Sequence, residues 1–386
     1  MLDRLSSDII LKSILAVLAS VAIISLGTRV WDSWQQLGAA TQAERVAAVS
    51  GQAFTALVNI RTDRSSTSRT WAQDGDLTPD VKSYLSGIRD TEMPAIRATL
   101  TLIDEIPIAG ADTLVPELRQ LSDKLAALQT EYWAGMARPK AERRTKLADE
   151  YMQAGLALQT NLEKLSAGLF SVIKAKDPFI DQMMEVKQLA WQARNLAGEA
   201  SLIISNGLAA RKVPADAMQK YAGFVGGTNA TWAAIEGVIT GIALPAQFDE
   251  SIAAAKNTFF APDYLATRDR LLNQLLNGDK PEMTADQWSP YTVPKLGLML
   301  TVADAALKQA KDHAVAIQSA TMVRLAWQLA LLVGAVLLSF GSILLVTRRI
   351  TTPLHTLRDS MLKLAGGDLS AEAPFTDRHD EIGALA

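Results

Sequence analysis

The stretch "LAWQLALLVGAVLLSFGSILLVT", residues 325–347, contains no charged side chain and decides how the chain is organised. At about 1.5 Å of rise per residue it forms a helix of about 34 Å, long enough to cross a hydrocarbon core of roughly 30 Å. A helix also satisfies its backbone hydrogen bonds internally, as a lipid surrounding requires. The stretch therefore predicts a membrane span.

A second apolar stretch lies near the N-terminus. It is "IILKSILAVLASVAIISLG", residues 9–27, and its only charged side chain is Lys12, whose ammonium group can extend to the membrane interface. The alternative is a cleaved signal peptide, but no small-residue cleavage site follows and the helical pattern continues without a break. We therefore expect a first membrane span at residues 9–28.

Basic residues flank both spans on the sides nearest the chain termini. They are Arg4, Lys12, Arg348, Arg349, Arg358 and Lys363. By the positive-inside rule, residues 1–8 and 348–386 are expected in the cytoplasm. Residues 29–324 then face outward, into the periplasm if the cell is Gram-negative and otherwise into the extracellular space. The expected location is the inner membrane, with membrane lipid as a partner.

The outer segment, residues 29–324, has the pattern of long helices. Apolar residues recur three and four positions apart, as in Val46, Val49 and Ala53. In "DGDLTPD" (74–80), Thr78 is expected to cap a helix that begins at Pro79. The "KDPF" stretch (176–179) is expected only to kink a long helix. Long helices joined by short turns predict an all-α bundle.

Two pairs of stretches indicate an internal duplication with an offset near 130 residues. "DGDLTPDVKSY" (74–84) resembles "NGLAARKVPADAMQKY" (206–221), and "LAALQTEYWAG" (125–135) resembles "IAAAKNTFFAP" (252–262). The alternative is that alanine-rich helices look alike. A duplication predicts two four-helix modules, about 40–175 and 176–320, and leaves open whether they are stacked or side by side.

The tail after the second span is "RRITTPLHTLRDSMLKLAGGDLSAEAPFTDRHDEIGALA", residues 348–386. Thr351 or Thr352 is expected to cap a helix that restarts at Pro353. An apolar heptad seam follows, which needs a partner helix to bury it: Ile350, Leu354, Leu357, Met361 and Leu364. Two glycines end this helix, and "DEIGALA" begins another with acidic residues at its N-terminus.

This order of motifs after a membrane span resembles the HAMP linker of bacterial transmembrane receptors. The resemblance implies a parallel homodimer and a signal relay through Pro353, Leu357, Met361, Gly367, Asp368, Leu369, Asp380 and Glu381. The layout of span, helical outer domain, span and HAMP is similar to that of methyl-accepting chemotaxis receptors. The outer region is similar to their double four-helix sensor domains, including the helical bimodular and nitrate-sensing types. In that family the second HAMP helix is longer than the segment that ends here at Ala386. We therefore expect this helix to be cut short in the present sequence, before an output region that would reach a kinase or adaptor.

The chain lacks the motifs of common enzymes and cofactor sites. It has no cysteine, its three histidines lie far apart, and it contains neither a phosphate-binding loop nor a nucleophile elbow. We therefore expect no catalytic residue, metal or cofactor, and the net charge of −3 does not favour nucleic acid. A chemosensory receptor is the first hypothesis. The alternatives are the front half of a sensor histidine kinase or diguanylate cyclase, and a structural membrane protein without a ligand.

One arginine-rich stretch, "NIRTDRSSTSRTW" (59–71), is either a candidate ligand site, a place of structural ion pairing or a frayed, exposed helix end. Continuing the apolar stripe of the preceding helix places Arg64, Ser68 and Trp71 toward the core. Arg61 lies on a neighbouring row, and Arg69 falls off the stripe and is expected at the surface.

A buried arginine needs an acceptor, because an unpaired buried charge is costly. One hypothesis is a structural partner for Arg64, such as Glu92 or Asp104 on the next helix, or a contact across a dimer. The other is a small carboxylate or oxyanion held by the arginines together with Ser65 or Ser68. In the second half, "WQARNLAGEAS" (191–201) places Arg194 at a comparable point, where Glu199 could neutralise it. The predicted ligand-binding residues are Arg61, Arg64, Ser65, Ser68 and Arg194.

Overall fold

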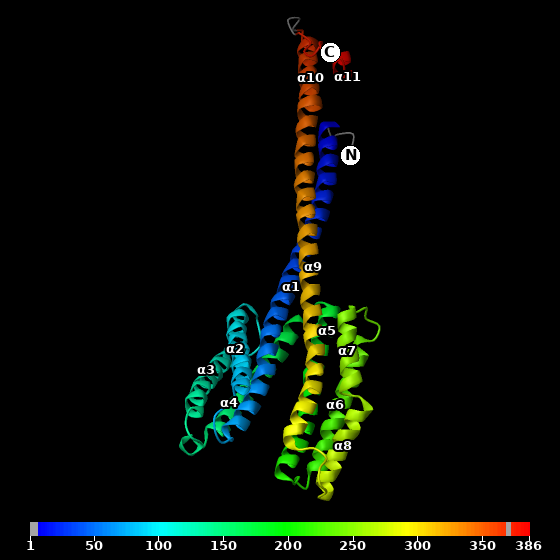
Figure 1. Cartoon of the computed structure of the whole chain (residues 1–386). Coiled ribbons are helices and arrows are strands. Elements are labelled where there is room, and N and C mark those ends of the chain that lie inside the picture. Colours follow the sequence, from blue (N-terminus) through cyan, green and yellow to red (C-terminus); the bar gives the residue numbers. More distant parts are fainter. Residues whose placement is uncertain (1–6, 368–371) are drawn as a thin grey trace. The chain divides into compact units, whose positions relative to one another are not determined.

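The computed structural model describes residues 7–367 and 372–386, and these contain helices but no strand (Figure 1). The predicted all-α fold is confirmed. The α-helices are α1 (Ser7–Trp71), α2 (Pro79–Leu102), α3 (Ala111–Met136), α4 (Leu147–Ile173), α5 (Pro178–Ala210), α6 (Ala217–Ile239), α7 (Ala246–Thr258), α8 (Pro262–Asn277), α9 (Ala285–Val346), α10 (Thr352–Ala365) and α11 (Glu381–Leu385). Short helical turns lie at η2 (Ile103–Glu105), η3 (Lys140–Glu142) and η4 (Thr347–Thr351).

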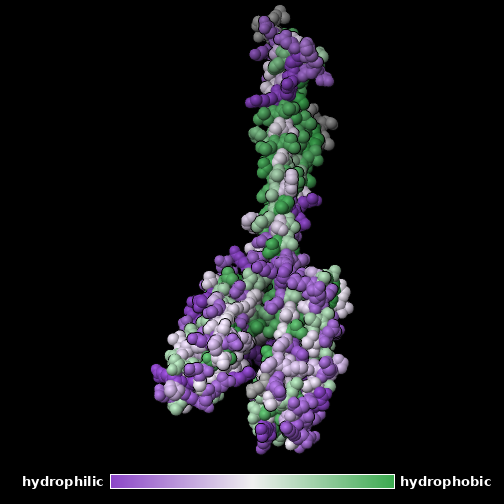
Figure 2. All heavy atoms as spheres, viewed as in Figure 1, coloured by the Kyte–Doolittle hydropathy of each residue, from purple (hydrophilic) through white to green (hydrophobic). Residues whose placement is uncertain are grey.

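The chain divides into two compact units. One comprises Met1–Gly38 and Ile317–Ala386, and the other comprises Ala39–Ala316. In the first unit, α1 and α9 are each long and apolar enough to cross a membrane. The side chains of their apolar segments are exposed, as for Leu18 and Leu338, and Figure 2 shows them as an apolar band. An exposed apolar band of this length fits a hydrocarbon surrounding.

In the second unit, residues 39–71 of α1 form a first bundle with α2, α3 and α4. The predicted start of α2 is confirmed, because the Thr78 hydroxyl accepts a hydrogen bond of 3.4 Å from the amide of Val81 and Pro79 is the first helical residue. Gly110 turns the chain into α3 with a φ of 78°. Residues other than glycine rarely adopt this left-handed backbone conformation.

A second bundle contains α5, α6, α7, α8 and residues 285–316 of α9 (Figure 1). The expectation that Pro178 only kinks a helix is wrong. Residues 174–177 separate α4 from α5, and the Asp177 carboxylate caps α5 by accepting a 2.9 Å hydrogen bond from the Ile180 amide. Pro178 directly follows the capping residue Asp177, so it occupies the first position of α5 and begins this helix instead of bending a longer one.

The two bundles lie side by side and share a continuous apolar core. Phe54 of α1 meets Trp191 of α5 edge to face, with ring centroids 5.8 Å apart. The indole of Trp191 also donates a 2.9 Å hydrogen bond to Glu163 of α4. Helices α1, α4 and α5 therefore form the seam between the bundles, and α1 contributes to both.

The junction between α9 and α10 differs from the sequence prediction. No helix restarts at Pro353, because Thr351 and Thr352 have helical backbone angles and a π turn, η4, joins the two helices without a break. The amide of Thr352 donates to the carbonyl of Thr347, five residues earlier. The wider turn accommodates Pro353, which lacks an amide donor.

Candidate functional site

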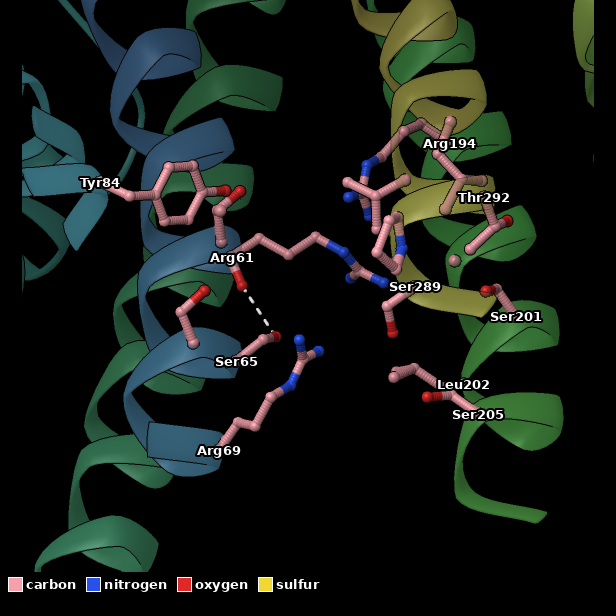
Figure 3. Close-up of a pocket in the computed structure, with 16 residues that line it drawn as sticks. Arg61, Ser65, Arg69, Tyr84, Arg194, Ser201, Leu202, Ser205, Ser289 and Thr292 are labelled. Carbon is pink, nitrogen blue, oxygen red and sulfur yellow. Dashed lines mark hydrogen bonds between the residues drawn. The ribbon is translucent and has the colours of Figure 1, made fainter. Parts of the chain in front are cut away.

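A cavity of about 340 Å³ lies within the second unit and is lined by α1, α2, α5 and α9. Arg61 and Arg69 extend into it from α1, while Arg194 comes from α5 (Figure 3). Hydroxyl groups surround these three guanidinium groups, from Ser65, Ser201, Ser205, Ser289 and Thr292 among others. None of the described residues that line the cavity is acidic. The lining therefore offers hydrogen-bond donors and positive charge, the two requirements of an anion site.

Arg61 is buried and bridges the two bundles. Its Nη2 lies 3.1 Å from Oε1 of Glu199 on α5, just outside the lining. The Glu199 side chain is 42% exposed, so water screens this ion pair and its carboxylate can turn outward at little cost. Arg61 thus holds a replaceable counter-ion.

Arg194 of α5 is half-buried and less well paired than Arg61. Its Nε has no hydrogen-bond partner among the described residues. Burial and, to a smaller extent, the neighbouring charge of Arg61 together lower the pKa of Arg194 to about 9, against the opposing charge of Glu199. A guanidinium in this position gains from any anion that binds beside it, because the anion stabilises the charged form.

Gly198 allows Arg61 and Arg194 to approach each other. A Cβ atom at this position would lie 2.6 Å from Nη2 of Arg61 and 2.9 Å from Nη1 of Arg194. Any larger residue would displace both guanidinium groups. This glycine carried no recognisable sequence signal, because its importance comes from a contact with a distant helix.

The structure corrects the predicted role of Arg64. Arg64 does not line the cavity. It packs against α4, where its Cβ lies 3.2 Å from the position that a Cβ atom on Gly155 would occupy. Neither predicted partner reaches it: Glu92 accepts a hydrogen bond from Gln129, and Asp104 is exposed in η2. Burial lowers the pKa of Arg64, and the charge of Arg61 lowers it further.

Two other predictions about this stretch also need correction. Ser68 does not line the cavity, and Arg69 does, although Arg69 is exposed as expected. Arg61, Ser65 and Arg69 are spaced four residues apart and therefore occupy one row of α1. Following that row, instead of the apolar stripe, would have found the lining residues of α1. Glu199 pairs with Arg61, whereas the sequence indicated Arg194 as its partner.

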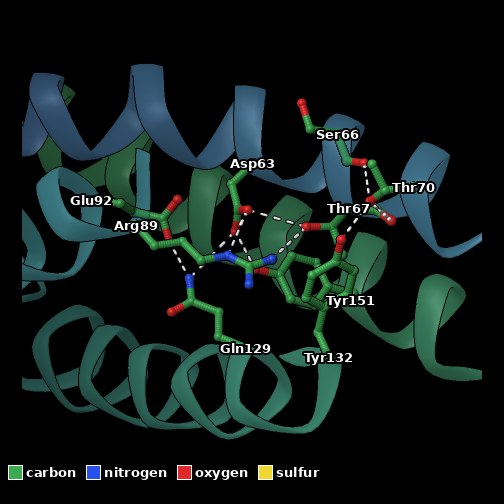
Figure 4. A network of polar contacts seen from close by, with 9 residues as sticks. All are labelled: Asp63, Ser66, Thr67, Thr70, Arg89, Glu92, Gln129, Tyr132 and Tyr151. Atoms are coloured by element: carbon green, nitrogen blue, oxygen red, sulfur yellow. Dashed lines mark hydrogen bonds and ion pairs between the residues drawn. The ribbon is translucent and has the colours of Figure 1, made fainter. Parts of the chain in front are cut away.

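A second polar centre lies inside the first bundle (Figure 4). Asp63 of α1 is fully buried and accepts hydrogen bonds from Arg89 Nε at 2.9 Å, Thr67 Oγ1 at 3.1 Å and the hydroxyl of Tyr151. The guanidinium of Arg89 also lies 4.5 Å from the ring centroid of Tyr132. Asp63 was missed, because its partners Arg89, Gln129 and Tyr151 come from three other helices.

Glu92 of α2 is the second carboxyl group of this centre. It receives a 2.9 Å hydrogen bond from Gln129, while its Oε2 has no partner among the described residues. Burial raises the pKa of Glu92 well above 4.5, and the charge of Asp63 raises it further. Asp63, in contrast, accepts several hydrogen bonds and lies beside the guanidinium of Arg89. The centre joins all four helices of its bundle and encloses no predicted ligand residue.

The predicted relay residues occupy the tail of the first unit. Pro353 and Leu357 are buried, Met361 is exposed, and Gly367 adopts φ 92° at the end of α10. Asp380 caps α11 by accepting a 3.2 Å hydrogen bond from the amide of Gly383, and Glu381 begins that helix. The ion pair with Arg378 lowers the pKa of Asp380 to about 2. Asp368 and Leu369 lie outside the described residues.

Comparisons with known proteins assign the tail. The HAMP domain model matches residues 345–386. No curated protein matched the chain. Among solved structures, the NasR transcription antiterminator is similar with a TM-score of 0.58 and 14% identity, over 90% of this chain and 89% of that chain. At that identity the likeness concerns the fold alone. Residues 345–386 are a HAMP domain, and together with two apolar helices they make this chain a HAMP-containing, membrane-associated protein of the signal-transducing receptor kind.

Proposed function

We propose that the chain is a chemotaxis-type transmembrane receptor whose outer domain binds a small anion in the arginine-lined cavity. The observation that carries the proposal is the convergence of Arg61 and Arg194, one from each bundle, in a cavity with no acidic side chain among its described lining residues. Two guanidinium groups held this close repel each other, and an anion between them removes that cost.

The helices that line the cavity support a role in signalling. α1 and α9 both contribute lining residues, and both continue into the candidate membrane spans. A ligand that binds one arrangement of α1, α5 and α9 more tightly than another shifts the population between them. Small displacements of helices of this kind are a common means of switching.

The HAMP domain supports a homodimer as the signalling form. In the single chain, the apolar heptad residues Leu354, Met361 and Leu364 of α10 are exposed. A parallel partner helix would bury them as heptad positions. In this proposal the spans cross the inner membrane with both termini in the cytoplasm, and the signal passes to a downstream kinase through an adaptor. The proposal assigns no enzymatic activity to the chain itself.

The test is a thermal unfolding screen of the full chain in lipid nanodiscs against nitrate, organic acids and amino acids. A ligand at 100 times its dissociation constant should add about 2.7 kcal/mol of stability. Arg61→Gln and Arg69→Gln should abolish or strongly weaken the shift, because each removes a lining charge. Arg119→Gln on α3 is the matched control, since Arg119 is exposed and lies away from the cavity. A shift that both cavity variants retain in full would show that the anion site is wrong.

A further inference from the structure

The arginine-lined cavity also has an apolar wall. Tyr84 of α2, Leu202 of α5 and Val293 of α9 all line it, yet they are 54%, 42% and 48% exposed. Figure 3 shows Tyr84 and Leu202 beside the cavity, on opposite helices. Three large apolar side chains from three helices are thus left in water around one opening.

Exposed apolar surface of this kind is a source of binding free energy. Covering it with an apolar group gains roughly 25 cal/mol for each Å² removed from water. A ligand that covered the exposed hydrophobic residues at this rim would therefore remove their apolar surface from water. An inorganic oxyanion would use the arginines and hydroxyl groups but would leave this surface wet.

The polar side of the cavity has the complementary chemistry. A guanidinium group presents a planar fork of donors that matches a carboxylate in two parallel hydrogen bonds. Arg61 and Arg194 lie close enough to hold one such group between them, since one added Cβ at Gly198 would touch both. The cavity of about 340 Å³ falls within the range of small-molecule pockets, about 300–1,000 Å³.

We infer that the ligand is an organic carboxylate with an apolar body: its carboxylate binds Arg61 and Arg194, and its body covers Tyr84, Leu202 and Val293. This inference rests on the proposed function, because it assumes that the cavity binds an anion.

The test measures dissociation constants of the full chain in nanodiscs, by titration calorimetry, for nitrate, acetate, propanoate and butanoate at constant ionic strength. The carboxylates share one head group and differ only in methylene count. Affinity should rise about fourfold for each methylene that becomes buried, which corresponds to about 0.8 kcal/mol. Leu202→Ser and Val293→Ser should flatten this rise and leave acetate binding within about twofold. Leu156→Ser on α4 is the matched control, because Leu156 is 49% exposed and does not line the cavity.

The outcomes separate the two claims. A rise in affinity along the series that Leu202→Ser reduces and Leu156→Ser does not would support the inference. Nitrate binding as tightly as butanoate, with no effect of Leu202→Ser or Val293→Ser, would overturn it and leave the proposed anion site intact. Binding of all four anions that Arg61→Gln leaves unchanged would overturn the proposed function itself.

Discussion

Lys187 of α5 is fully buried at the seam where α1, α4 and α5 meet. Its ammonium group donates to the hydroxyl of Ser166 on α4 and lies 5.7 Å from the ring centroid of Phe54 on α1. Burial lowers the pKa of Lys187 to about 7. Lys187, like Glu92 and Arg194, is an ionisable residue inside the second unit, so the stability of this unit depends on the charge state of a few side chains.

Lys187→Met should make unfolding less dependent on pH. A base whose pKa is lowered from 10.5 to about 7 by folding binds fewer protons in the folded state between these values. Its contribution to stability is therefore present in full above pH 10.5 and is lost as the pH falls to about 7. The unfolding midpoint of the parent chain should be higher at pH 9 than at pH 6, and Lys187→Met should reduce that difference. Lys164→Met, at an exposed position of α4, serves as control and should reproduce the parent difference.

Glu199→Gln should strengthen anion binding. In the free protein the Glu199 carboxylate occupies Arg61, so an incoming anion must replace it. An exposed ion pair is worth at most about 1 kcal/mol, so the gain in affinity should reach up to about fivefold. Glu185→Gln is the control, because Glu185 is exposed on the same helix and does not line the cavity. Weaker binding in Glu199→Gln would mean that Glu199 helps to hold the ligand.

At the scale of elements, close helix contacts determine where the guanidinium groups can lie. Helices α1 and α5 approach at Gly198, where the space of a missing side chain is filled by Arg61 and Arg194. The two arginines are flexible at their ends, so a larger residue would move them before it moved the backbone. The cavity is thus more sensitive to this position than the fold is.

Gly198→Ala should weaken anion binding at little cost in stability. The new methyl group displaces both guanidinium groups, while alanine in a helix gains up to about 1 kcal/mol over glycine. Gly226→Ala on α6 is the matched control, because nothing lies within 4 Å of its added Cβ. That variant should raise the unfolding midpoint and leave the dissociation constant unchanged. Equal binding by both variants would contradict the role given to Gly198.

Arg378 should hold the last segment of the HAMP domain in place. Its Nη2 donates a 3.1 Å hydrogen bond to the carbonyl of Arg349, and its Nε lies 3.1 Å from Asp380, which caps α11. Arg378→Ala should therefore increase the hydrogen exchange of residues 381–385, measured by mass spectrometry. Arg358→Ala provides the comparison, because Arg358 pairs with the adjacent Asp359. Unchanged exchange in Arg378→Ala would show that the segment is held by other contacts.

At the scale of the whole molecule, the sequence predicted the all-α class, both apolar helices and the HAMP domain. These depend on hydrophobic periodicity and short motifs, which are local properties of the chain. Arg61, Ser65 and Arg194 line one cavity, although Arg194 was expected in a separate site of the second half, and Arg64 and Ser68 do not line it. Arg69, Gly198 and the apolar wall depend on how α1, α5 and α9 pack, and no single helix encodes that contact. Asp63 was missed for the same reason, because its partners come from three other helices.

The proposed topology can be measured directly, because the chain contains no cysteine and each introduced thiol reports alone. Asp76→Cys, in the turn between α1 and α2, should react with a membrane-impermeant maleimide in intact spheroplasts. Glu372→Cys, in the HAMP domain, should react only after the membrane is permeabilised, because the proposed topology, which rests on the basic flanks, has this residue in the cytoplasm. Labelling of both sites in intact spheroplasts, or of Glu372→Cys alone, would contradict the orientation.

The π turn at η4 changes how residues are counted between the span and the HAMP helix. An α-helix advances by about 100° per residue, and a π turn holds one residue more than an α turn. Ile350 lies within this turn and Leu354 lies beyond it. A heptad numbering that starts in the span and continues into α10 is therefore shifted by about 100° around the helix axis. In the proposed homodimer, the residues that would face the partner in the membrane and those that would face it in the HAMP domain follow two separate registers, offset by a single position.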